Sequence, residues 1–237
     1  MVHTSNCMIC GGELKYSSLH EEKECYYCKD KLQANAECVN GHYVCDKCHS
    51  ATANSIIKRY CLGTDITNPL IMVNEIMNHP SINMHGPEHH FLIPAVLITA
   101  YYNATNQQEL IKEKLEEVEK RAEKILGGFC GFYGACGAGI GAGIAVSIIT
   151  NATPLTSDSW RLSNLITSKT LNNIAEAGGP RCCKRTTYIS LIKSVEFIES
   201  NFNVILGKSK DIICSHNKRN KECIGNKCNF FIRKKGL

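Results

Sequence analysis

The chain has 237 residues, which is enough for one sizeable domain and a small module. Of these residues 43% are hydrophobic and 21% are charged, an ordinary balance for a globular protein. Fifteen cysteines are far more than usual. The first residues lack the charged and apolar segments of a secretory signal, which disfavours a disulfide-rich secreted protein. We therefore expect the cysteines to bind metal in a reducing cytoplasm.

The net charge of +5 is unevenly distributed along the chain. Residues 208–237 hold nine lysines or arginines against two acidic residues, a local charge of +7, and the rest of the chain is close to −2. Composition thus divides the chain into three parts. We predict a zinc-binding module at 1–50, a helical domain at 51–207 and a basic, cysteine-containing tail at 208–237.

The first part contains four pairs of metal-ligand residues at the spacing with which one tight turn grips a tetrahedral ion. They are Cys7 and Cys10, Cys25 and Cys28, Cys38 and His42, and Cys45 and Cys48. Eight ligands predict two zinc sites. The pairs either interleave, as Cys7, Cys10, Cys38 and His42 against Cys25, Cys28, Cys45 and Cys48, or combine in sequence order. The last pair opens a predicted helix at 51–60, which resembles a treble-clef finger.

Helix signals dominate the second part, and no sustained alternation of apolar and polar residues occurs there. Asn68 and Pro69 predict a helix start, as a cap residue followed by proline. A capping box at 105–108 predicts a second helix that ends before Gly127 and Gly128, and 186–202 predicts a third. We expect a mainly α fold with a glycine-rich buried helix.

Residues 127–149 combine eight glycines and two cysteines without any charge. A membrane span, a tightly packed core helix and the wall of a site are all compatible with this composition, but few large apolar side chains are present to drive insertion, so we expect no membrane association. Glycine inside a helix costs about 1 kcal/mol relative to alanine. Either close helix packing or a ligand near the backbone must compensate, and Cys130 and Cys136 favour the ligand.

A second cysteine-bearing turn, GGPRCCKR at 178–185, places Cys182 and Cys183 among three cations. A helix N-terminus and neighbouring cations both lower the pKa of a thiol, so we expect lowered values here. The alternative is that the two cysteines are buried as small hydrophobic residues.

A third cluster, HGPEHH at 85–90, contains His85, Glu88, His89 and His90. Imidazoles and a carboxylate can ligate metal or transfer protons. An exposed polar loop before the next helix is the alternative.

HGPEHH, GFCGFYGACGAGIGAG and GGPRCCKR, together with the cysteine-rich start and tail, resemble a cysteine-rich family of unknown function from anaerobic archaea and bacteria. The Ala135–Ala138 and Gly179–Cys182 segments are also similar to motifs of iron–sulfur L-serine dehydratases and L-cysteine desulfidases. Those enzymes have an acidic residue after the Gly-Cys motif and separate their later cysteines, whereas this chain has neither feature.

The second resemblance implies a 4Fe-4S cluster and a lyase or sulfur-transfer reaction. Three thiolates leave one iron of a cubane free to bind a substrate atom. The implied ligands are Cys130, Cys136, Cys182 and Cys183, in a three- or four-cysteine arrangement. Arg181, Lys184 and Arg185 would bind a small anionic or nucleotide substrate, and the HGPEHH residues would move protons.

The tail offers a further metal site of Cys214, His216, Cys223 and Cys228, with zinc or an auxiliary iron–sulfur cluster. Its charge and two phenylalanines suit RNA binding through phosphates and stacking. Three function classes therefore remain open. They are an iron–sulfur enzyme, a zinc-dependent RNA-binding or tRNA-modification accessory protein, and a zinc-stabilised helical adaptor without catalysis.

Overall fold

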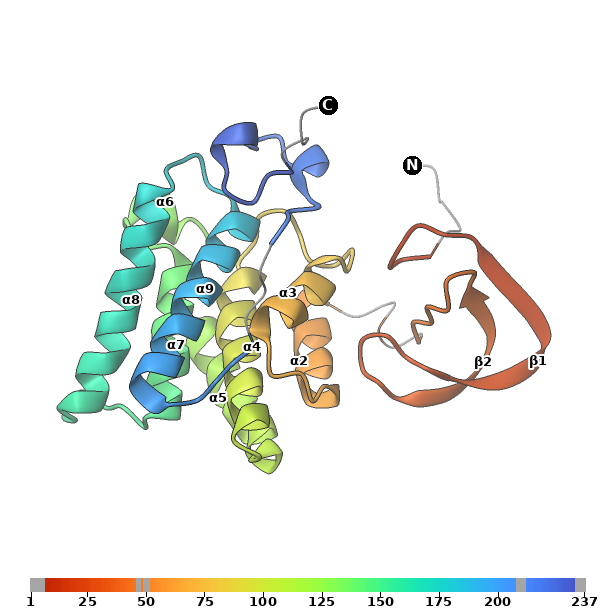
Figure 1. The fold of residues 1–237 in the computed structure, drawn as a ribbon, viewed down its shortest axis with the longest axis horizontal. Coiled ribbons are helices and arrows are strands. Elements are labelled where there is room, and N and C mark those ends of the chain that lie inside the picture. Colours follow the sequence, from red (N-terminus) through yellow and green to blue (C-terminus); the bar gives the residue numbers. More distant parts are fainter. Residues whose placement is uncertain (1–6, 46–47, 49–51, 208–211, 233–237) are drawn as a thin grey trace.

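The computed structural model describes residues 7–45, 48, 52–207 and 212–232. Figure 1 shows a small β module at the N-terminal end of the chain, a bundle of helices beside it, and a C-terminal segment that lies across one end of the bundle. Two residues in the turn of the last ligand pair, 46 and 47, lie outside the described residues, as does residue 51, the first of the predicted helix at 51–60.

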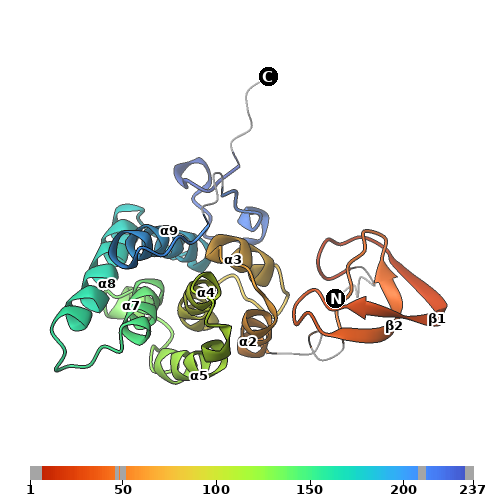
Figure 2. The same ribbon diagram turned by 60° about the horizontal axis from the view of Figure 1, so that its bottom comes forward.

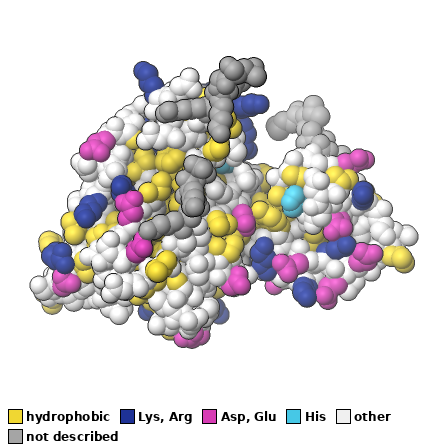
Figure 3. Space-filling view, in the orientation of Figure 1, with side chains coloured by type: hydrophobic (Ala, Val, Ile, Leu, Met, Phe, Trp, Pro, Cys, Tyr) yellow, Lys and Arg dark blue, Asp and Glu magenta, His cyan; other side chains and the backbone are white. Residues whose placement is uncertain are grey.

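The β module is a curved hairpin of two antiparallel strands, β1 (Leu14–Glu24) and β2 (Lys31–Cys38). Their register shifts between Tyr16 and Glu21, where the pairing is interrupted. Charged side chains of both signs cover the hairpin in Figure 3, and Lys23 contacts both Glu21 and Glu37. With so few buried apolar side chains, a two-stranded sheet is marginal in water and needs another source of stability.

The rest of the described chain is helical, which confirms the mainly α fold with a small N-terminal cysteine-rich module. The helices are α2 (Ala53–Gly63), α3 (Pro69–Met77), α4 (Glu88–Ala104), α5 (Ile111–Ala122), α6 (Phe129–Phe132), α7 (Gly137–Ile149), α8 (Asp158–Glu176) and α9 (Cys183–Phe202). Short 3-10 turns occur at Gln108–Leu110, Asn217–Arg219 and Gly225–Lys227.

Helix α4 is the centre of the bundle. It contacts α2, α3, α5, α7 and α9, which surround it in Figure 2. Nearly all of its residues are buried, in keeping with a sequence that is apolar on every face. The central position of α4 brings the first turns of α4, α7 and α9 close to the segment that carries the remaining cysteines.

The glycines of α7 allow close helix packing. A Cβ on Gly137 would collide with the ring of His90, and one on Gly141 would lie 2.9 Å from Cδ of Pro94, both on α4. On the other side, Gly139 and Gly143 face α8 in the same way. The expectation that these helical glycines leave backbone bare for a ligand is therefore wrong for α7, because neighbouring helices occupy that space.

The predicted helix starts have different outcomes. Asn68 caps α3 as expected, since its Oδ1 accepts hydrogen bonds from the backbone N–H groups of Leu70 and Ile71. The prediction that a capping box at 105–108 starts a helix is wrong. Thr105 instead ends α4 by donating its hydroxyl to the carbonyl of Tyr101, and α5 begins only at Ile111.

Within the described residues, every helix is too short or too polar to traverse a lipid bilayer. The glycine-rich segment in particular forms a helix of only 13 residues.

Candidate metal centres

Two sets of side chains in the β module converge tightly enough to hold one metal ion each. The outer set is Cys7, Cys10, Cys38 and His42, and the inner set is Cys25, Cys28, Cys45 and Cys48. Within each set the ligand atoms all lie within 4.8 Å of one another. The geometry corresponds to the interleaved arrangement of the four pairs.

Tight turns of the backbone direct N–H groups at these sulfurs. Cys7 Sγ accepts from the N–H of Ile9, and Cys38 Sγ from that of Asn40, both at 3.4 Å. The Asn40 side chain also donates to Cys10 Sγ, and this bond, with a second from the N–H of Gly12, lowers the pKa of Cys10 to about 6. Such bonds stabilise the thiolate form, which is the form that binds metal.

The inner set connects the β module to the bundle. His79, after α3, donates from Nε2 to the carbonyl of Cys48 at 3.1 Å. Its ring also packs edge-on against Tyr27, and Arg59 of α2 lies 3.8 Å from Cys48 Sγ. A metal in the inner set would therefore order both the hairpin and its contact with the helices.

An open pocket of about 300 Å³ lies at the end of the bundle where α6, α7 and α9 begin. We call it the open pocket. Its wall includes Cys130, Cys136, Cys182 and Cys183, along with backbone of Gly131 and Gly134. Cys130 is exposed, whereas Cys136 and Cys183 are partly buried. The four cysteines assigned to an iron–sulfur cluster thus share one cavity.

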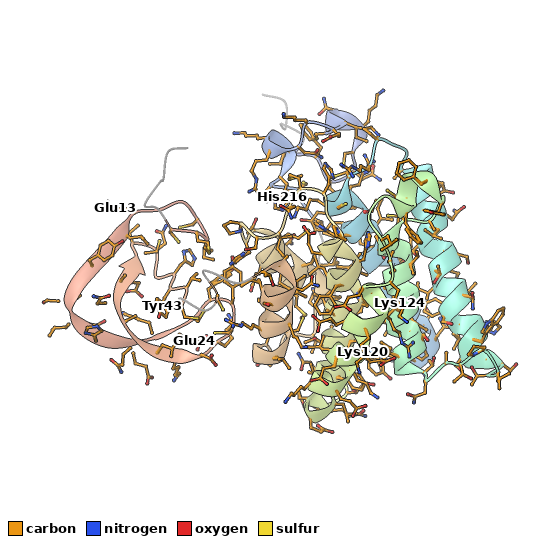
Figure 4. All side chains as sticks on the ribbon, turned by 180° about the vertical axis from the view of Figure 1, so that it is seen from behind. Glu13, Glu24, Tyr43, Lys120, Lys124 and His216 are labelled. Carbon is orange, nitrogen blue, oxygen red and sulfur yellow. The ribbon has the colours of Figure 1, made fainter. Side chains whose placement is uncertain are left out.

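A second, much smaller cavity of about 20 Å³ lies between α9 and the C-terminal segment. We call it the tail cavity. Its wall includes Cys182, Cys214, His216, Cys223 and Cys228. Figure 4 shows His216 where this segment meets the bundle. Cys182 lines both cavities, whereas Cys183 lines only the open pocket.

The expected lowering of thiol pKa values at the start of α9 is wrong for the metal-free chain. Burial raises the pKa of Cys182, and it raises that of Cys183 to about 11. The N-terminal N–H groups and Arg185 oppose this effect at Cys182 without overcoming it. Desolvation outweighs the helix dipole because both side chains are mostly removed from water.

The three cations assigned to substrate binding have different environments. Arg181 is exposed and lines the open pocket. Arg185 is buried, and its Nη2 donates to the carbonyls of Gly178 and Pro180, which fixes the loop before α9. Lys184 is completely buried, and its Nζ has no hydrogen-bond partner. Arg181 is thus the exposed cation of the three, although Arg185 also lines the open pocket.

The residues assigned to proton transfer lie behind the wall of the open pocket and do not line it. His90 donates from Nδ1 to the carbonyl of Ile125, and His85 Nε2 contacts the side chains of Asn220 and Glu222. His89 is 1% exposed, and burial, with the charge of Lys184, holds its pKa well below the ordinary range. Glu88 is buried and accepts from the N–H of Asn83.

Over the described residues, neither cavity contains ligand atoms that converge on a single ion as the module sets do. The side chains predicted as tail ligands therefore line a cavity and do not converge on one position. Sequence spacing could not have joined Cys182 to the tail, because the connection depends on how residues after α9 fold back over its first turn. Five of the nine cations behind the RNA prediction, at 208, 210 and 233–235, lie outside the described residues.

Comparison with known proteins identifies the family but not the activity. Residues 57–231 match a family of unknown function, DUF5714, and the chain belongs to this family. No curated protein and no solved structure matches it. The match spans the helices and the C-terminal segment and begins after the β module. The resemblance to serine dehydratases and the anaerobic origin stay predictions.

Proposed function

We propose that the protein is an iron–sulfur enzyme that eliminates or transfers a hydroxyl or sulfur group on a small anionic substrate. The open pocket is the reaction site in this proposal. One observation carries it: Cys130 of α6, Cys136 at the start of α7, and Cys182 and Cys183 at the start of α9 all line one cavity that opens to solvent.

The donor set fits a cluster better than a single ion. All four thiols are free, and no group of them converges as the module ligands do, over the described residues. Soft thiolate ligands select iron–sulfur clusters or zinc over hard cations. The remaining volume of the pocket leaves space for a small substrate beside a cluster held by Cys130, Cys136 and one cysteine of the pair.

A cluster with three thiolate ligands supplies a Lewis-acidic iron for a substrate oxygen or sulfur. The protein residues supply recognition. Arg181 lies on the pocket wall, where a guanidinium can bind a carboxylate in two places. In an elimination the substrate loses a proton from one carbon and hydroxide or hydrosulfide from the next. The HGPEHH residues remain the proposed final acceptors of that proton, and Gly86 holds them directly behind the pocket wall through its backbone hydrogen bond to Cys183.

We propose zinc for both sets of the β module. Two compact sets of four cysteine and histidine side chains fit the four-coordinate, tetrahedral ligation that structural zinc prefers. Their role is to fold the hairpin and hold it against α2 and α3.

Anaerobic purification of the full chain tests the enzyme proposal. We expect iron and acid-labile sulfide in equal amounts, visible charge-transfer absorption, and release of pyruvate and ammonia from L-serine, or of pyruvate, ammonia and sulfide from L-cysteine. Cys136→Ser should remove the pocket cluster and any such activity, whereas Cys61→Ala, a core variant away from both cavities, should remove neither.

Arg181→Gln separates recognition from cluster binding. We expect full iron content and a raised KM, because the variant loses only the charge that meets the substrate. Zinc as the sole metal in the anaerobic preparation, or full iron content in Cys136→Ser, would refute the enzyme proposal.

A further inference from the structure

We propose that Cys182, Cys214, Cys223 and Cys228 together ligate a separate iron–sulfur cluster in the tail cavity. This set takes Cys182 away from the open pocket and replaces His216 in the tail. The site stands on its own residues, and it does not depend on a cluster in the open pocket.

The four thiols line one cavity. All four line the tail cavity, and Cys214 is close enough to the other three for their charges to interact. Cys182 is likewise within electrostatic range of Cys228. Three of the ligands come from turns of the tail and one from the first turn of α9.

His216 also lines the cavity, but its ring has a different contact. Its Nδ1 accepts a hydrogen bond of 2.8 Å from Arg219. Cys182 is the better fourth ligand because a thiolate completes an all-cysteine set, the usual ligation of iron–sulfur clusters.

The volume of the tail cavity that the thiols line favours a cluster over one zinc ion. Sulfurs bonded to a single zinc lie about 2.3 Å from it, too close together to leave space for a water-sized sphere at their centre. The inner and outer sets of the same chain show that compact arrangement, with ligand atoms within 4.8 Å. The tail cavity instead retains about 20 Å³ between its walls, above the ~10–15 Å³ that one water needs.

A buried cation supplies a second observation. Lys184 is 0% exposed, its Nζ has no hydrogen-bond partner, and it lies within electrostatic range of both Cys183 and Cys182. The carboxylate of Glu88 acts on it through its charge without a hydrogen bond to Nζ, and accepts instead from the backbone N–H of Asn83. An unpaired buried charge is costly. A cluster with four thiolates is negatively charged, and it would add a second counter-charge for Lys184 to that of Glu88.

The adjacent cysteines provide a matched pair of variants for the test. In Cys182→Ser the hydroxyl can keep the helix cap, because Cys182 Sγ now accepts from the N–H of Arg185 and serine is a preferred cap residue. We would measure iron, sulfide and zinc per chain in anaerobic full-length Cys182→Ser, Cys183→Ser and Cys228→Ser, with circular dichroism as the check on folding.

We expect Cys182→Ser and Cys228→Ser to lose the same iron, and the double variant to lose no more than either single variant. Cys183→Ser should keep that iron. If the open pocket also holds a cluster, Cys183→Ser loses the iron of that cluster instead. If the enzyme proposal fails, Cys183→Ser loses no iron, and the expected iron loss in Cys182→Ser and Cys228→Ser is unchanged.

Three outcomes would overturn the tail cluster. In the first, Cys182→Ser retains the iron that Cys228→Ser loses. In the second, Cys182→Ser and Cys183→Ser lose the same iron. In the third, the tail variants lose zinc instead of iron. If Cys182→Ser does not fold, the comparison of Cys223→Ser with Cys228→Ser and the metal that they lose decide between cluster and zinc.

Discussion

The β module and the cysteine-lined end of the bundle use the same side chain in opposite ways. In the module, short turns bring sulfurs to a point, and the hairpin has little apolar surface of its own to bury. At the end of the bundle, an existing helical core positions cysteines around cavities. Metal in the module would thus maintain the fold, whereas any metal at the bundle would enter cavities that the helical core has already formed.

Removal of a module ligand should have the largest effect. We expect Cys45→Ser to unfold the hairpin and lose zinc, because structural zinc contributes about 10–16 kcal/mol to folding in small domains. Most helical signal should survive, since α4 and its neighbours have their own core. Zinc analysis and far-ultraviolet circular dichroism check this. A full zinc complement, or loss of most helix, would contradict the contrast between the two regions.

The opposite variant should damage the bundle and spare the module. A Cβ at Gly141 meets the ring of Pro94 and lies 3.3 Å from the carbonyl of His90, and neither can rotate away. We expect Gly141→Ala to lower the free energy of unfolding by about 1–3 kcal/mol, the usual cost of overpacking. Chemical denaturation measures it.

Gly127→Ala is the control, since a Cβ there meets nothing within 4 Å. Equal stability of the two variants would show that α7 and α4 do not pack as closely as described. Zinc content should be unchanged in both.

Acidification should destabilise the bundle through His89. The folded chain holds this imidazole neutral well below the ordinary pKa of about 6.5, so only the unfolded chain takes up its proton as the pH falls through that value. The contribution of His89 to the free energy of unfolding is complete above pH 6.5. Below that pH it falls by at most about 1.4 kcal/mol for each pH unit.

Urea denaturation between pH 7.5 and 5.5 measures the slope. His89→Gln should reduce it without abolishing it, because burial also lowers the pKa of His216 to about 4, whereas His20→Gln, at an exposed histidine of β1, should leave it unchanged. An unchanged slope in His89→Gln would show that another group carries the pH dependence.

The smallest effect should come from a surface ion pair within the bundle. Lys58 of α2 contacts Glu119 of α5 at 2.9 Å, and both side chains are partly exposed. We expect Lys58→Met to cost about 0.2–1 kcal/mol and to lose this difference at high salt. Lys112→Met, at an exposed lysine of α5, provides the comparison. A cost of several kcal/mol would mean that the helices depend on charge more than on their core.

The sequence predicted the module ligands because each pair is local. A spacing of two or three residues already defines the turn, although it does not decide which pairs combine. Asn68 was predictable for the same reason. The prediction of a helix start at Thr105 was wrong because a residue of this type can also end a helix. Helix α4 continues to Ala104, and Asn106 then takes a left-handed conformation with φ of 55°.

The bundle end was less predictable because its cysteines meet through tertiary structure. The sequence grouped Cys182 with Cys183, since adjacent residues look like partners. In the structure only Cys182 also faces the returning tail, where Asn220 donates to its sulfur at 3.4 Å. The pKa prediction at these thiols failed because burial cannot be read from neighbouring charges alone.

The central position of α4 has a consequence for synthesis on the ribosome. The chain is made from its N-terminus, so α4 emerges well before α7 and α9, two of the helices that cover it. A helix that is apolar on every face has no surface suited to water in the interval. Until residue 202 has been translated, the nascent chain must shelter α4 against its earlier helices or against a chaperone.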